Sequence, residues 1–237
     1  MKPLMVLAGG FGTRLRSIVS DVPKPLAPVA GEPFIVHLIE HWVGQGVVDF
    51  IFLLHYEAAK IESMLNELKL RSELSGVTFR VVIENTPLGT GGAILNAIDV
   101  LGITEAFLVA NADTWLGSGV EKLSAMESSA LAAVYVSNSQ RYGSLQFEGD
   151  KISAFQEKLD SVDQGYVNSG LYHLLPGVFH GFKVGSNFSI EDEIFPLLVS
   201  KRNLEVVKLD ESFIDIGIPE DYLKYCNWVE LGRTYEL

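Results

Sequence analysis

The sequence has a single cysteine, Cys226, so a disulfide within the chain is impossible. No apolar run approaches the roughly 20 residues that a transmembrane helix requires, and the longest runs, such as Phe50–Leu54, are far shorter. The apolar residues that follow Lys2 are broken by Gly9 and Gly10, too early for the hydrophobic region of a signal peptide. These absences predict a soluble, cytoplasmic protein that does not contact membranes.

Basic residues are also scarce: 18 Lys and Arg stand against 30 Asp and Glu, a net charge of −12. This charge excludes nucleic-acid binding through a broad basic face. Residues 1–31 differ from the rest, because they hold four basic residues and only one acidic residue, Asp21. The four are Lys2, Arg14, Arg16 and Lys24. A small basic region in an acidic chain predicts a small anionic ligand.

The first 137 residues alternate between short apolar segments and segments with helical spacing, which is typical of βαβ units and a mainly parallel sheet. Strands are expected at Leu4–Ala8, Phe50–Leu54, Phe79–Ile83, Phe107–Ala110 and Ala132–Val136. Helices are expected at Phe34–Val43, Ala58–Leu70, Ala93–Leu101 and Val120–Met126. The pattern predicts an α/β fold, a three-layer α/β/α sandwich.

After residue 138 the pattern changes to strands separated by turns. These are expected at Ser144–Phe147, Ile152–Gln156, Tyr166–Leu175, Leu204–Leu209 and Phe213–Ile216. Helices should begin at Ser189, which forms a capping-box pattern with Asp192, and at Pro219. No linker or repeat separates the two parts. We expect one domain over residues 1–237, whose second half, 138–237, flanks or covers the first half, 1–137.

The first expected strand leads directly into a glycine loop, Gly9-Gly10-Phe11-Gly12-Thr13-Arg14. At the carboxyl end of a parallel strand, such glycines let backbone N–H groups approach an anion. No Gly-Lys-Ser/Thr follows, so this is not a Walker loop, and Leu15 stands where a dinucleotide-binding fingerprint requires a small residue. The loop therefore predicts a phosphate site and argues against an oxidoreductase; a tight turn that uses glycine only for its geometry is the alternative.

Lys24 lies between Pro23 and Pro25. Proline fixes φ and disfavours helix in the residue before it, so we expect this lysine on a stiff extended segment. A held lysine near Arg14 favours a contact to phosphate over the usual solvated surface position.

Eight segments together resemble the sugar-1-phosphate nucleotidyltransferase family. They are Leu7–Leu15, Pro23–Leu26, Pro28–Pro33, Pro87–Ala93, Asp113, Glu157–Lys158, Val167–Gly170 and Ile214–Gly217. The stretch Phe213–Tyr222 and the short length look most like the heptose-1-phosphate and mannose-1-phosphate guanylyltransferase branch. One departure is Ala112, where the family commonly has glycine.

The resemblance implies a mainly parallel, mixed, Rossmann-like sheet of the nucleotide-diphospho-sugar transferase type. It also implies that a sugar 1-phosphate attacks the α-phosphorus of an NTP, releasing pyrophosphate and forming an NDP-sugar. The first half would then bind the nucleotide and the second half the sugar phosphate. A non-catalytic regulatory subunit with the same fold is the alternative of another class, and a homo-oligomer is compatible with the sequence.

The family's functional positions transfer to this sequence residue by residue. The catalytic residues would be Arg14, Lys24, Asp113 and Asp215, of which the two aspartates would hold Mg²⁺. Nucleotide contacts would come from Leu7, Gly9, Gly10, Gly12, Thr13, Glu84, Pro87, Gly89 and Thr90. Sugar-phosphate contacts would come from Gly143, Glu157, Lys158 and Asn168, with Lys158 on the phosphate. A turn is the alternative role for Gly143, Glu157 and Asn168. A cap or turn is the alternative role for Asp113 and Asp215, each taken alone.

Glu84 suggests which base is bound. It ends an expected strand and precedes the loop that encloses the nucleobase in the family. A carboxylate only accepts hydrogen bonds, and guanine offers it two adjacent donors, N1–H and the 2-amino group. Uracil and thymine offer one donor between two carbonyl oxygens. We therefore expect GTP as the nucleotide and, by resemblance, a D-glycero-D-manno-heptose 1-phosphate as acceptor. The alternatives are mannose-1-phosphate guanylyl transfer and glucose-1-phosphate uridylyl or thymidylyl transfer. For Glu84 itself, the alternative is a solvated residue at the end of a strand, with backbone groups reading the base.

Overall fold

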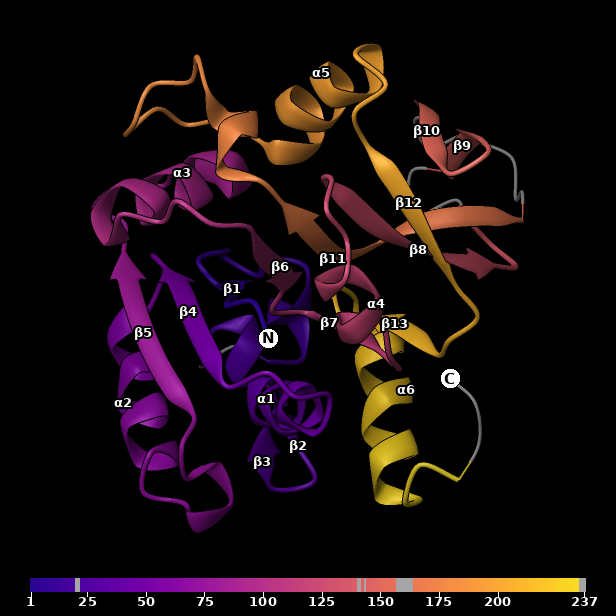
Figure 1. Ribbon diagram of the computed structural model, residues 1–237. Coiled ribbons are helices and arrows are strands. Elements are labelled where there is room, and N and C mark those ends of the chain that lie inside the picture. The colour runs from indigo at the N-terminus through magenta and orange to yellow at the C-terminus, as the bar shows by residue number, and fades with distance from the viewer. Residues whose placement is uncertain (20–21, 140–141, 143, 157–163, 235–237) are drawn as a thin grey trace.

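The computed structural model describes residues 1–19, 22–139, 142, 144–156 and 164–234 (Figure 1). Within these residues, nine strands form one sheet in the order β5-β4-β1-β6-β11-β8-β12-β10-β9. They are β1 (Leu4–Leu7), β4 (Asp49–Leu54), β5 (Thr78–Ile83), β6 (Phe107–Asn111), β8 (Ala130–Val136), β9 (Ser144–Glu148), β10 (Lys151–Gln156), β11 (Gly165–Leu174) and β12 (Glu205–Leu209).

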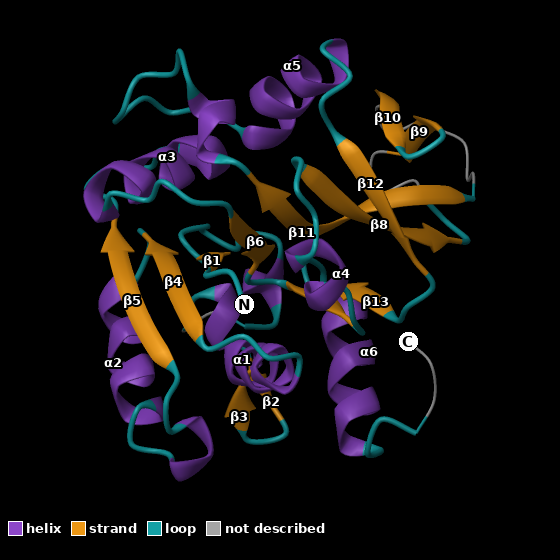
Figure 2. Cartoon of the chain, in the orientation of Figure 1, coloured by secondary structure: helices purple, strands orange, loops and turns teal. Residues whose placement is uncertain are grey.

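Helices flank this sheet (Figure 2). They are α1 (Phe34–Gly44), α2 (Ala58–Leu68), α3 (Gly89–Leu101), α4 (Val120–Ser124), α5 (Phe195–Ser200) and α6 (Pro219–Glu230). Two ribbons lie outside the main sheet. One joins β2 (Pro28–Val29) to β3 (Glu32–Pro33), and the other joins β7 (Thr114–Leu116) to β13 (Phe213–Asp215).

The sheet is mixed. Strands β5, β4, β1 and β6 run parallel to one another, and β1 lies between β4 and β6. Strand β11 is antiparallel to both β6 and β8, whereas β8 is parallel to β12. The predicted α/β class with a mainly parallel, mixed sheet is therefore confirmed.

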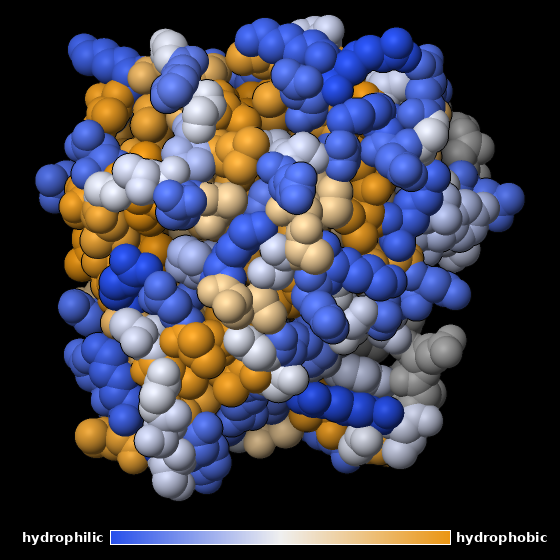
Figure 3. Space-filling view, viewed as in Figure 1, coloured by the Kyte–Doolittle hydropathy of each residue, from blue (hydrophilic) through white to orange (hydrophobic). Residues whose placement is uncertain are grey.

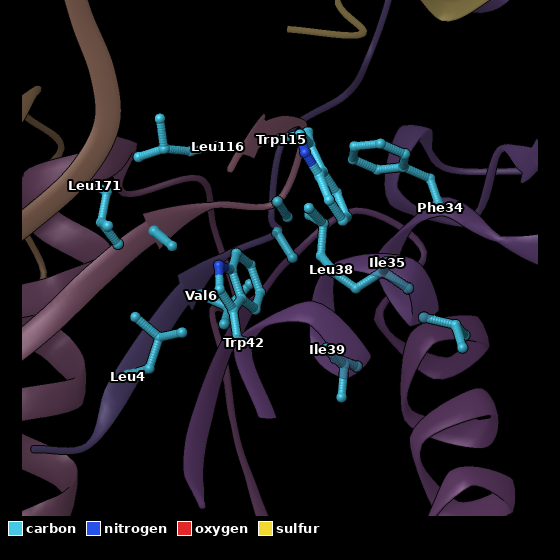
Figure 4. Close-up of a cluster of buried hydrophobic side chains, with 14 of the residues drawn as sticks. Leu4, Val6, Phe34, Ile35, Leu38, Ile39, Trp42, Trp115, Leu116 and Leu171 are labelled. Carbon is cyan, nitrogen blue, oxygen red and sulfur yellow. The ribbon is translucent and has the colours of Figure 1, made fainter. Parts of the chain in front are cut away.

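Two hydrophobic clusters hold the layers together, because successive side chains of a strand point to opposite faces. From β1, Leu4 and Val6 join Trp42 of α1 and residues of α2 and α6 in one cluster, part of which Figure 4 shows. Met5 joins the other cluster, with Ile94 of α3 and Phe195 of α5. Removal of these apolar side chains from water is the main force that fixes the helices on the sheet.

The five strands predicted for the first half agree with the observed ranges to within two residues, whereas the short strands β2, β3 and β7 were not predicted and α3 begins at Gly89, four residues before its predicted start. The segment after Ser189 forms one π-helical turn, Ile190–Ile194, before α5. The predicted cap is present, since the Ser189 hydroxyl accepts a hydrogen bond from the Asp192 N–H at 3.1 Å.

The prediction of an extended segment at Lys24 is wrong. Lys24–Leu26 forms a single 3₁₀ turn, closed by hydrogen bonds from the Leu26 N–H to the Pro23 carbonyl and from the Ala27 N–H to the Lys24 carbonyl. Pro25 is compatible with this turn because its fixed φ lies in the 3₁₀ range and its missing N–H is not needed there.

The two halves of the chain share the sheet. Strand β8, which belongs to the first 137 residues, lies between β11 and β12 from the second half. The later residues thus extend the sheet from the edge of β6 (Figure 1). Among the described residues, no helix combines the length and the apolar character needed to cross a membrane. Hydrophilic and hydrophobic residues are interspersed on the face of the molecule in Figure 3.

Candidate active site

The carboxyl ends of the four parallel strands meet at one edge of the sheet, and a polar side chain or the glycine loop lies at each of them. Glu84 follows β5, His55 follows β4, Gly9 follows β1, and Asn111 ends β6. In open α/β sheets, ligands bind beyond this edge, next to the strand at which the strand order reverses direction. Here that strand is β1. The fold therefore places the glycine loop where a ligand is expected.

Two adjoining cavities open at this edge. The first, of about 290 Å³, is lined by Leu7, Ala8, Gly10, Gly12, Thr13, Arg14, Lys24, Pro25, Ala112, Asp113, Asp215 and Gly217. The second, of about 380 Å³, is lined by Leu7, Gly9, Gly10, Phe11, Leu53, His55, Glu84, Pro87, Gly89, Thr90, Ala93, Asn111, Asp113, Asn187 and Glu191. They share Leu7, Gly10 and Asp113. Every residue predicted to be catalytic or to bind nucleotide lines one of them.

Asp113 and Asp215 are 102 residues apart in sequence, and the ribbon of β7 and β13 brings them together. Asp215 lies opposite Thr114 in this ribbon, and the Ile216 N–H donates to the Asp113 carbonyl at 2.9 Å. The Lys24 ammonium lies between the two carboxylates, 2.6 Å from Asp113 Oδ2 and 3.4 Å from Asp215 Oδ1.

The surroundings of the aspartate pair shift the pKa of Asp215. Burial raises the pKa of Asp215, the Asp113 charge raises it further, and Lys24 and the Gly217 N–H oppose the rise. The Gly217 N–H donates to Asp215 Oδ1 at 2.6 Å. The pair is thus an anionic site that favours a cation, and Lys24 supplies one positive charge to it.

Glu84 is the buried carboxylate of the second cavity, with 7% of its surface exposed. Its Oε2 accepts a hydrogen bond from the Leu88 N–H at 2.8 Å. Burial raises the pKa of Glu84, while that hydrogen bond and nearby His55 partly oppose the rise. Since the Glu84 carbonyl only accepts, His55 Nδ1 donates to it, at 2.9 Å. One carboxylate oxygen thus orders the following loop, and within the described part of the chain no hydrogen bond to Oε1 competes with a ligand.

Gly89, Gly91 and Gly92 have a structural role that the sequence did not indicate. The segment Ser186–Ile190 packs directly on them: a Cβ at Gly91 would lie 2.3 Å from the Phe188 ring, and one at Gly92 would lie 2.3 Å from the Ser186 carbonyl. Thr90 adds two hydrogen bonds between α3 and this part of the chain. Its hydroxyl donates to Glu191 Oε2 at 2.7 Å and accepts from the Ile190 N–H at 2.9 Å.

Three of the four predicted sugar-phosphate residues, Gly143, Glu157 and Lys158, lie outside the described residues. The fourth, Asn168, lines neither cavity, and its amide is used within the chain. Its Nδ2 donates to the Tyr172 hydroxyl at 3.0 Å, and its Oδ1 accepts from the Gly170 N–H at 2.9 Å.

The basic region of residues 1–31 contributes less to the site than its sequence suggested. Arg14 and Lys24 line the first cavity. The Lys2 ammonium instead donates to the Ser124 and Met126 carbonyls, at 2.7 and 2.8 Å, next to α4. Lys2 therefore supports the fold rather than the site.

Sequence reasoning missed five polar or aromatic residues of the second cavity. They are Phe11, His55, Asn111, Asn187 and Glu191. His55 and Asn111 could have been found, because each stands at the carboxyl end of an expected parallel strand. No sequence signal marks Asn187 or Glu191, which reach the site only through the packing of their loop on α3.

Comparison with known proteins agrees with this geometry. The family described as Nucleotidyl transferase matches residues 4–230. A D-glycero-alpha-D-manno-heptose 1-phosphate guanylyltransferase of Campylobacter jejuni is 35% identical over 223 residues, which cover 93% of this chain and 97% of that protein. A mannose-1-phosphate guanyltransferase of Candida albicans is 32% identical over 92% of this chain, which corresponds to 62% of that longer protein.

Solved structures agree as well. The crystal structure of HddC from Yersinia pseudotuberculosis complexed with GMP-PN is similar with a TM-score of 0.82 and 34% identity. The match covers 97% of this chain and all of that one. These matches confirm the resemblance seen in the motifs: the chain belongs to the nucleotidyl transferase family.

Proposed function

We propose that the chain transfers a guanylyl group from GTP to D-glycero-D-manno-heptose 1-phosphate, releasing pyrophosphate and forming a GDP-sugar. The observation that carries the choice of GTP is the buried Glu84 carboxylate in the second cavity. With Oε2 fixed by the Leu88 N–H, the carboxylate is held in place to accept hydrogen bonds from guanine N1–H and the 2-amino group. The heptose is supported by the name of the Campylobacter jejuni relative.

In this reaction a phosphate oxygen of the sugar 1-phosphate attacks the α-phosphorus of GTP. A new P–O bond forms as the bond from the α-phosphorus to the bridging oxygen breaks, and pyrophosphate leaves with that oxygen. The nucleophile is already an anion at pH 7, so no base has to remove a proton from it. Catalysis then depends on positioning and on neutralising phosphate charge.

The first cavity has the groups for this task. Arg14 presents a guanidinium that fits phosphate oxygens, and the glycine loop presents backbone N–H groups. We assign both to the triphosphate, with Lys24 near the transferred phosphate. Lys158, Glu157 and Gly143 remain our proposed contacts to the sugar phosphate, whereas the internal bonds of Asn168 to Tyr172 and Gly170 favour a structural role for that residue. In this assignment most nucleotide contacts come from residues 1–137 and the sugar-phosphate contacts from residues 138–237, although Asp215, Asn187 and Glu191 of the second half also line the two cavities.

The residues at the aspartate pair suit a divalent cation, for which we propose Mg²⁺. Among the described residues there is no cluster of three or more His, Cys, Asp or Glu. Mg²⁺ does not need one, because it is usually held by one or two carboxylates together with substrate phosphates and water. Asp113 and Asp215 would hold the ion, which would neutralise charge on the phosphates when bound.

The test is a pyrophosphate-release assay on the full chain with Mg²⁺. Each of the nucleotides GTP, ATP, CTP, UTP and dTTP is combined with each of the 1-phosphates of heptose, mannose and glucose. We expect GTP with D-glycero-D-manno-heptose 1-phosphate to give the highest kcat/KM. Asp113→Asn and Asp215→Asn should each lower turnover by roughly 100-fold or more, because each removes a charge that faces the reacting phosphates.

Glu84→Gln tests the choice of base separately. A site that hydrogen-bonds a base can reject the wrong one by up to about 10⁴-fold, and the variant should erode the preference for GTP over UTP and dTTP. Glu105→Gln, an exposed carboxylate outside both cavities, is the matched control and should keep that preference. A wild-type preference for UTP or dTTP would refute the role of Glu84 and leave nucleotidyl transfer standing.

A further inference from the structure

Lys24 holds an unusual position for a lysine. Its side chain is only 11% exposed, and its ammonium forms ion pairs with both Asp113 and Asp215. Buried ammonium groups are costly unless they are paired. The two aspartates are the carboxylates that would hold a divalent cation. The lysine therefore occupies the place where positive charge is required.

Two glycines leave room for this arrangement. A Cβ at Gly12 would lie 2.7 Å from Lys24 Cβ, and Gly12 has a φ of +59°. A Cβ at Gly217 would lie 3.1 Å from the Lys24 ammonium and 2.8 Å from Asp215 Oδ1. At Gly12 the short contact and the positive φ exclude an ordinary side chain, and at Gly217 a Cβ would push the ends of the Asp215 and Lys24 side chains apart. The path of Lys24 to the aspartates is thus built into the loops on either side of it.

A lysine ammonium and a divalent cation cannot both use these carboxylates at full strength. The two positive charges would repel each other a few ångströms apart, in a partly buried site where such repulsion is weakly screened. A metal ion that binds alone must therefore displace Lys24 from its ion pairs and leave the ammonium without a partner. A metal ion that arrives with a triphosphate brings an anion that can accept the lysine.

We propose that Lys24 is an internal counter-ion that excludes free divalent cations, so that metal and nucleotide triphosphate enter the site together. The inference rests on the proposed function in one respect, the assignment of Asp113 and Asp215 to the metal. Linkage makes the coupling reciprocal: the triphosphate strengthens metal binding by the same factor by which the metal strengthens triphosphate binding. Lys24 would then leave the two aspartates and contact the transferred phosphate only when the metal is in place.

The test measures metal binding without turnover. Mn²⁺ is the probe, and electron paramagnetic resonance counts the free ion in nucleotide-free protein. Lys24→Met keeps much of the length of the side chain and removes the charge, so it should bind Mn²⁺ at least about 10-fold more tightly than wild type, a typical size for such coupling. Lys151→Met is the matched control, because Lys151 also forms a 2.7 Å ion pair, with Glu205, away from the aspartates. It should bind Mn²⁺ as wild type does.

A second measurement is the melting temperature in EDTA and in Mg²⁺. Removal of the counter-ion leaves two carboxylates facing each other, so Lys24→Met should melt about 5 °C or more below wild type in EDTA. Mg²⁺ alone should restore most of that loss while raising the wild-type value little. If Lys24→Met does not fold in EDTA, folding that requires Mg²⁺ supports the proposal; if it folds in neither, Lys24→Gln replaces it in both measurements.

An unchanged or weaker Mn²⁺ affinity in Lys24→Met overturns the proposal, as does a melting temperature that gains no more from Mg²⁺ than the wild-type value does. Neither measurement involves a sugar phosphate or pyrophosphate release. Failure here therefore leaves guanylyl transfer untouched, and an inactive wild-type protein with the expected Mn²⁺ result would overturn only the proposed function.

Discussion

Two glycine-rich segments border the site, and they use glycine for different reasons: the first loop, Gly9–Thr13, follows β1, and the second loop, Pro87–Gly92, runs into the first turn of α3. In the first, around Gly10, a Cβ would meet no atom within 4 Å, so the space above the backbone is open to a ligand. In the second, the space that a Cβ at Gly91 or Gly92 would occupy is already taken by Phe188 and Ser186 of the same chain. Glu84 connects the two loops, because its Oε2 binds the Leu88 N–H and its Oε1 lies 3.5 Å from a Cβ placed at Gly9. Similar sequences therefore serve ligand access in one loop and chain packing in the other.

The largest effect should come from Gly12→Ala in the first loop. The new Cβ would lie 2.7 Å from Lys24 Cβ and would displace the lysine, so turnover should fall by about 100-fold. Gly31→Ala is the control, since Gly31 also has a positive φ, +86°, and no atom within 4 Å of its Cβ position. Equal losses of turnover in steady-state kinetics would show that backbone strain, and not the lysine, is responsible.

Gly92→Ala examines the second loop. Its Cβ would lie 2.3 Å from a backbone carbonyl, and overpacking of this kind should lower the free energy of unfolding by about 2 kcal/mol. Gly44→Ala, in the last turn of α1 with open space around it, should instead raise it by about 0.5 kcal/mol. Urea denaturation measures both, and a Gly92→Ala protein as stable as wild type would remove the distinction between the loops.

Gly10→Ala should weaken substrate binding and leave stability nearly unchanged, the reverse of what we expect for Gly92→Ala. With no contact to disturb, stability should stay within about 0.5 kcal/mol of wild type. The added methyl group projects into the cavities, so the KM for the triphosphate should rise about 10-fold, the loss of one good hydrogen bond. Normal kinetics in this variant would mean that the loop is a simple turn.

The smallest expected effect concerns Glu84, between the loops. Burial raises its pKa in the folded protein, so the ionised carboxylate is less favourable there than in the unfolded chain. The resulting penalty is absent below the unfolded pKa and appears as the pH rises through the folded pKa. Glu84→Gln should therefore be more stable than wild type at pH 7 and equal to it near pH 4, about the ordinary pKa of a glutamate.

Denaturation of the ligand-free protein at both pH values tests this, with the exposed Glu105→Gln as a control that should change stability by no more than about 0.2 kcal/mol. A Glu84→Gln protein that is less stable than wild type at pH 7 would mean that the hydrogen bond to the Leu88 N–H outweighs the cost of burial.

The parallel part of the sheet was predictable because its strands are short and mostly apolar, with Arg80 of β5 as an interruption, and each helix between them has one apolar face. Asp113 and the glycine loop followed from their place at the ends of such runs. The ribbon that unites Asp113 with Asp215 was not predictable, since each of its strands has only three residues and they pair across almost 100 residues of chain.

Lys24 and Glu191 show two other limits of prediction from the sequence. The prolines around Lys24 restrict φ, which a 3₁₀ turn and an extended strand both satisfy, so local sequence did not separate them. Glu191 joins the site through the docking of its loop on Thr90, a contact between residues 101 positions apart. Such contacts depend on tertiary packing and leave no periodic signal in the sequence.

The position of β11 next to β6 has a consequence for synthesis of the chain. The outer edge of β6, Phe107–Asn111, is paired only by Leu171–Leu174 of β11, about 60 residues later. At translation rates of about 5–20 residues per second, the nascent chain would expose this apolar edge for roughly 3–12 seconds. Unpaired edges of this kind are templates for aggregation. Early association with a chaperone, or slow emergence of the second half, should therefore change the yield of folded protein more than the activity of the molecules that fold.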